Sequence, residues 1–120
     1  MDEARFEEID TGFPVFGTVS FALFPDDGEQ HMLEVGSEPF RLGKESMGMA
    51  CVDPGARKCG IALRDGAPPE CLAHECWHLW HYLMALLEDD MEHGWMDAAG
   101  ELYAYSFSTL FESVRRRASA

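Results

Sequence analysis

The chain has 120 residues with 22 acidic and nine basic side chains, so its formal net charge is −13 at pH 7. At this length we expect one domain covering residues 1–120, and no apolar run reaches the roughly 18 residues of a membrane-spanning helix. The acidic surface would repel nucleic acid and attract basic partners. Because the N-terminal residues lack the basic-then-apolar order of a signal peptide, we expect a cytoplasmic protein, or one that leaves the cell by another route.

The first half of the chain is punctuated by glycine and proline and predicts short strands. Residues 13–24 alternate between apolar and small or polar side chains, which is the period of a strand with one buried face. Turn sequences follow at 25–29 (PDDGE) and 52–57 (VDPGAR). The expected strands cover residues 13–24, 31–35, 38–43 and 59–64. The segment around Met47 and Met49, with its two glycines, predicts a flexible loop.

The sequence Pro68-Pro69 ends the strand half and begins a helix that we expect over residues 69–88. Proline is favoured at the first helical position, and Glu70 suits the positive end of the helix dipole. The apolar arc of this helix consists of Leu72, Cys76, Leu79, Trp80, Leu83, Met84, Leu86 and Leu87. The opposite arc consists of Cys71, His74, His78 and His81.

A second helix is expected over residues 97–116, with Asp97 as a favourable N-cap. Its apolar arc consists of Ala99, Tyr103, Phe107, Leu110, Phe111 and Val114. Glu101 and Tyr105 lie on its polar arc. From their helical spacing we expect four aromatic side chains to belong to the core: Trp77, Trp80, Phe107 and Phe111. These elements predict an α+β fold, in which a small antiparallel or mixed sheet from about residues 12–64 packs against both helices.

The first helix carries His74-Glu75-Cys76-Trp77-His78, which is an HExxH sequence. Residues i and i+4 of a helix lie one turn apart, so two imidazoles there can converge on one ion at roughly 2.0–2.1 Å. Glu75 projects about 100° to the side, close to the ion but not bound to it. That position suits a general base for a metal-activated water. We therefore predict a Zn²⁺ site with His74 and His78 as ligands and Glu75 as a catalytic residue.

A catalytic zinc site uses three protein ligands, so a third must come from elsewhere in the chain. Glu101 is our prediction for this ligand, and Tyr105 follows it by one turn on the same side. Tyr105 would stabilise an oxyanion there or pack as an aromatic side chain. The alternatives that the sequence leaves open for the third ligand are Asp97, His81, His93 and Cys71. His81 lies about 10 Å along the axis from His74, which favours a supporting or substrate-contact role.

This pattern resembles the gluzincin metallopeptidases, in which a glutamate on a later helix completes the HExxH site. More narrowly, it is similar to small phage- and prophage-encoded HExxH proteins with a minimal zincin-like domain. The residues that match their second helix are Asp97, Glu101, Ala104 and Tyr105. The resemblance covers about residues 59–112. It implies that an edge strand just before the HExxH helix holds the substrate backbone, and residues 59–64 occupy that place.

Three functions follow from these observations. The first is a zinc metallopeptidase, of phage or prophage origin, that hydrolyses a peptide bond in a basic peptide or partner protein, with Glu75 passing the proton of water to the leaving nitrogen. The second is a non-catalytic zincin-fold protein that binds or assembles with a host or virion partner. The third is an acidic inhibitor that imitates nucleic acid. Each function is compatible with a monomer or a homodimer, and the four cysteines are expected as free thiols, with a Cys51–Cys59 disulfide left open.

Overall fold

The computed structural model describes residues 3–11, 18–90 and 100–119, and in residues 86–90 and 100–106 it describes the backbone alone. The elements in chain order are β1 (Arg5–Asp10), β2 (Thr18–Phe24), β3 (His31–Val35), β4 (Glu38–Leu42), β5 (Gly48–Asp53), β6 (Lys58–Arg64), α1 (Pro69–Asp90) and α3 (Gly100–Ala118). The expected α+β class is confirmed, and so is the mixed character of the sheet.

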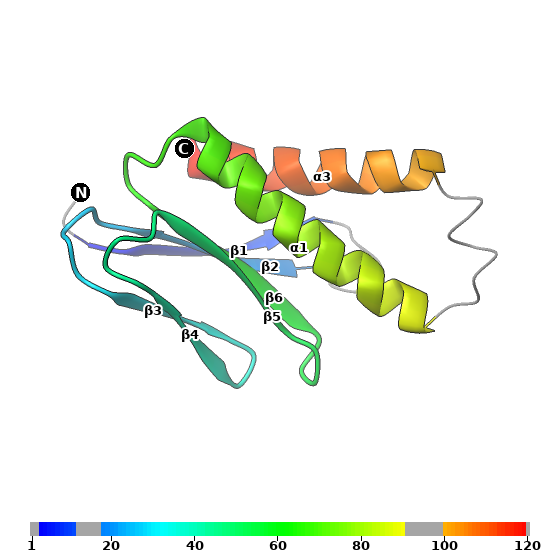
Figure 1. Cartoon of the computed structure of the whole chain (residues 1–120), viewed down its shortest axis with the longest axis horizontal. Coiled ribbons are helices and arrows are strands. Elements are labelled where there is room, and N and C mark those ends of the chain that lie inside the picture. The colour runs from blue at the N-terminus through cyan, green and yellow to red at the C-terminus, as the bar shows by residue number, and fades with distance from the viewer. Residues whose placement is uncertain (1–2, 12–17, 91–99, 120) are drawn as a thin grey trace.

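The described strands form a four-stranded sheet in the order β1-β2-β6-β5 and a separate β3–β4 hairpin. Within the larger sheet β2 and β6 are parallel, whereas β1–β2 and β5–β6 are antiparallel pairs. The two helices lie over one face of this sheet and the hairpin lies against the other (Figure 1). The protein therefore has three layers, with the sheet in the middle.

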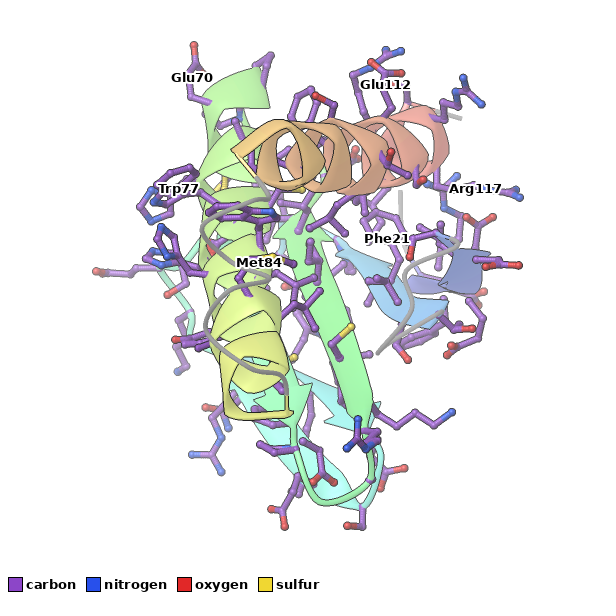
Figure 2. All side chains as sticks on the ribbon, turned by 90° about the vertical axis from the view of Figure 1, so that its right-hand side faces the viewer. Phe21, Glu70, Trp77, Met84, Glu112 and Arg117 are labelled. Carbon is purple, nitrogen blue, oxygen red and sulfur yellow. The ribbon has the colours of Figure 1, made fainter. Side chains whose placement is uncertain are left out.

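Both faces of the central strands are buried, which explains why β6 is apolar nearly throughout. Its residues Cys59, Ile61 and Leu63 face the helices, whereas Ala62 faces the hairpin. Side chains such as Phe21 and Met84 lie between the helices and the sheet, while Glu70, Glu112 and Arg117 point outward (Figure 2). A Cβ atom at Gly60 would lie 2.8 Å from Val35 Cγ2, so glycine at this position lets the hairpin close onto β6.

Two strands were not expected from the sequence. β1 covers N-terminal residues for which we predicted no strand, and β5 covers a stretch for which we predicted a flexible loop around Met47 and Met49. Of the expected strand over 13–24, the structure describes the part from Thr18 to Phe24 as β2, and residues 12–17 lie outside the described part of the chain. The helices extend to residues 90 and 118 rather than 88 and 116.

Arg64 closes the hairpin side of the sheet as a fully buried side chain. Its guanidinium donates hydrogen bonds to the carbonyl oxygens of Pro25, Glu29, Gly43 and Ser46. One charged group thus satisfies backbone acceptors from the two connections that flank the hairpin.

Among the described residues, neither helix is long and apolar enough to cross a membrane.

Candidate metal centre

The HExxH residues lie in the second and third turns of α1, and the packing of this helix sets their exposure. Leu72, Cys76, Leu79 and Leu83 are buried against the sheet. His74 and His78 project from the opposite side and are exposed. The amphipathic pattern of the helix is therefore confirmed over its described side chains.

The imidazoles of His74 and His78 face each other across one helical turn. Their Nε2 atoms are 3.0 Å apart, and the ring planes meet at 85° with centroids 4.5 Å apart. Two nitrogens that bind one tetrahedral zinc at 2.0–2.1 Å are separated by about 3.3–3.4 Å. The pair thus needs to open by only about 0.3–0.4 Å to hold such an ion.

Glu75 lies on the sheet side of this pair and is buried, with 8% of its surface exposed. Burial raises the pKa of its carboxyl above the ordinary value of 4.5, and the charges of protonated His74 and His78 act in the opposite direction. A carboxylate with a raised pKa is a better proton acceptor near neutral pH than an exposed one. The environment of Glu75 therefore suits the base that the motif predicts.

The start of β5 fixes the position of Glu75. A Cβ atom at Gly48 would lie 2.9 Å from Cys71 Sγ and 3.1 Å from Glu75 Cγ, so glycine allows β5 to pass directly beneath this part of α1. Our prediction that residues 59–64 form the edge strand beside the motif is wrong, because β6 lies between β2 and β5. The edge strand is β5, and Gly48 had been interpreted as part of a loop.

The third ligand is not assembled among the described side chains. They contain no group of three His, Cys, Asp or Glu residues that could hold a metal ion. Cys71 and His81 therefore do not complete the pair in this structure. The side chains of Glu101 and Tyr105 lie outside the described residues, although the backbone of both belongs to α3. Asp97 and His93 also lie outside the described part of the chain.

Aromatic side chains border the histidine pair on the side of α3. Trp77 stacks on Trp80 with ring centroids 5.4 Å apart, and Phe107 lies 5.8 Å from the Trp77 ring. His81 meets the Trp77 ring edge-on at 4.4 Å. Trp77 is 49% exposed, so its assignment to the core was wrong, while Trp80, Phe107 and Phe111 pack against the core as expected. The face that carries the histidines thus has one aromatic flank.

The cysteine thiols form neither a metal site nor a disulfide among the described residues. All four cysteines are free, and Cys51 and Cys59 lie on opposite faces of the sheet, which excludes a disulfide between them.

Comparisons with protein-family models, with characterised proteins and with solved structures found no match to the chain.

Proposed function

We propose that this protein is a zinc-dependent metallopeptidase whose metal is held by His74 and His78. The observation that carries the proposal is the 3.0 Å separation of the two Nε2 atoms, with the buried Glu75 carboxyl beside them. Without a metal, one Nε2–H donates a hydrogen bond to the other Nε2 over this distance, and a bound ion would take the place of that proton. The third ligand that we propose is Glu101, which lies in the first turn of α3.

The chemistry divides between the ion and the protein. A bound zinc supplies Lewis acidity toward water and toward the carbonyl oxygen of the substrate. Glu75 takes the proton of the attacking water and passes it to the leaving nitrogen, and its buried position keeps the carboxylate basic. Tyr105 is our candidate donor to the oxyanion. We place the substrate backbone on the outer edge of β5, which pairs only with β6 among the described strands and begins beneath Glu75.

The direct test is the zinc content of protein purified without chelator. We expect one zinc per chain, its loss in His74→Ala and His78→Ala, and weaker retention in Glu101→Ala. His81→Ala is the matched control, because His81 lies on the same helix face but contacts Trp77 and Trp80 instead of the pair. Glu75→Gln should keep the metal and lose hydrolysis of a basic peptide library. Failure to take up added zinc would refute the site.

A binding or assembly protein is the second candidate, and one observation favours it. The described side chains bring together two histidines but no third ligand, so they do not complete a catalytic zinc site. In that case Glu75→Gln would leave partner binding unchanged. The free thiols support a reducing compartment, and we propose the cytoplasm of a bacterial host.

A further inference from the structure

A pocket of about 330 Å³ opens at the outer edge of β5. Its lining is mostly apolar and comes from three elements: Phe40 of β4, Ala50, Cys51 and Val52 of β5 with the following Pro54, and Tyr82 of α1. Phe40 bounds it on the hairpin side and Tyr82, which is half exposed, bounds it on the helix side. This volume lies at the lower end of the range for ligand pockets and is large enough for one large apolar side chain.

The floor of the pocket is a strand edge with backbone groups available for pairing. The N–H of Arg64 donates to the carbonyl of Met47 over 2.8 Å, and the register then pairs Gly48 with Leu63. Because hydrogen-bonded and non-hydrogen-bonded pairs alternate in an antiparallel ladder, Ala50 and Val52 direct their N–H and C=O groups outward. Within the described residues β6 is the one strand that pairs with β5.

The same strand also lies next to Glu75 of the HExxH sequence. Gly48 lies beneath Glu75, and Tyr82 follows His78 by one turn of α1. Val52 lies four residues after Gly48, which corresponds to about 13 Å along a strand. An extended chain that pairs with β5 would therefore pass both Glu75 and the pocket, with about four of its residues between them.

We propose that this pocket binds one apolar side chain of an extended, cationic polypeptide segment that pairs with the edge of β5. The backbone groups of Ala50 and Val52 would hold the main chain, and Tyr82 and Phe40 would enclose the side chain. The net charge of −13 for the whole chain favours a cationic segment over an acidic one. That the bound segment is a substrate rests on the proposed function, whereas its binding does not.

The test uses metal-free full-length protein with the Glu75→Gln change and a fluorescent nine-residue peptide as the probe. The peptide has one central phenylalanine, lysines at both ends and neutral residues between them. We expect binding that weakens at least about tenfold when phenylalanine is replaced by serine or the lysines by glutamates. N-methylation should abolish binding at one set of alternate amides and leave it intact at the other set, since only alternate N–H groups pair with β5.

Variants of the protein locate the binding. Tyr82→Ala and Phe40→Ala should each weaken binding about tenfold, whereas Phe6→Ala, which removes an equally exposed aromatic from β1, should have no effect. Equal affinity for the phenylalanine and serine peptides, an unaltered Tyr82→Ala, or no binding at all would overturn the proposal. A dimer that the peptide does not dissociate would also overturn it, because a second copy would then occupy the edge.

The two proposals fail separately. Binding with the expected selectivity by a protein that takes up no zinc would leave the pocket standing and refute the metallopeptidase. Zinc-dependent hydrolysis of the phenylalanine and serine peptides at equal kcat/KM would leave the metallopeptidase standing and refute the pocket.

Discussion

Replacing Gly48 with alanine should separate β5 from α1 at the point where Glu75 is held. The added Cβ would lie 2.9 Å from Cys71 Sγ, 3.0 Å from Leu63 Cδ2 and 3.1 Å from Glu75 Cγ. Optimal non-bonded separations are about 3.5–4.0 Å, so all three neighbours must give way. Two of them belong to one turn of α1 and the third is buried in the core, so no single flexible side chain can absorb the change.

We expect a net destabilisation of about 1–2 kcal/mol. Overpacking of this kind costs about 1–3 kcal/mol, and the smaller entropy of the unfolded alanine chain offsets about 0.4–1 kcal/mol. For a chain of 120 residues, 1 kcal/mol corresponds to about 4 °C in Tm. The loss should therefore appear as a decrease in Tm of about 4–8 °C, accompanied by slower peptide hydrolysis at unchanged zinc content.

Thermal and urea unfolding measure this effect against two matched variants. Gly55→Ala is the control, because the nearest atom to its Cβ is Asp53 Oδ1 at an ordinary 3.6 Å. Adding Cys71→Ala to Gly48→Ala removes the closest contact and should restore part of the stability. If Gly48→Ala were as stable as Gly55→Ala, the packing of β5 against Glu75 would not be as we describe it.

Three further predictions concern groups whose environment is equally well defined. Glu75→Gln in metal-free protein should be more stable than the parent at pH 8 but not at pH 4. Because the pKa of Glu75 is raised in the folded protein, its contribution to the free energy of unfolding is complete below about pH 4.5 and diminishes as the pH rises. Equal stability of the two proteins in urea at pH 8 would contradict this prediction. Arg64→Leu should lower the free energy of unfolding, measured in urea, by about 3–5 kcal/mol, because it leaves buried carbonyl oxygens without a donor. Arg64→Lys should recover part of this stability. A loss below about 1 kcal/mol for Arg64→Leu would refute that role of the guanidinium. Iodoacetamide should label Cys71 alone in the native state, as mass spectrometry can verify, because burial raises to about 12 the pKa of Cys51, Cys59 and Cys76.

The sequence alone was sufficient to predict the elements whose apolar residues recur at a regular spacing. The hairpin strands were expected at 31–35 and 38–43 and lie at His31–Val35 and Glu38–Leu42. Helix α1 and strand β6 were also expected within two residues of their described bounds. In each case burial against a neighbouring layer imposes a period that can be recognised without knowledge of the neighbour.

The two strands that were missed are the two edges of the sheet. Ile9 is the one buried side chain of β1, and the side chains before it alternate between partly buried and exposed. β5 begins with Gly48, Met49 and Ala50, which have little preference for strand. An edge strand pairs on one side and contributes less to the core, so its conformation depends on the strand beside it more than on its own residues.

The candidate site shows the same division between local and long-range causes. The spacing of His74 and His78 follows from helix geometry alone, and their convergence could be predicted from five consecutive residues. The burial of Glu75 could not, because it depends on a glycine 27 positions earlier that is placed beneath it by the β5–β6 register. Motif and fold therefore supply different parts of the proposed chemistry. The motif brings the two imidazoles together, while the edge strand buries the Glu75 carboxyl and raises its pKa, and it is the surface that we propose for the substrate.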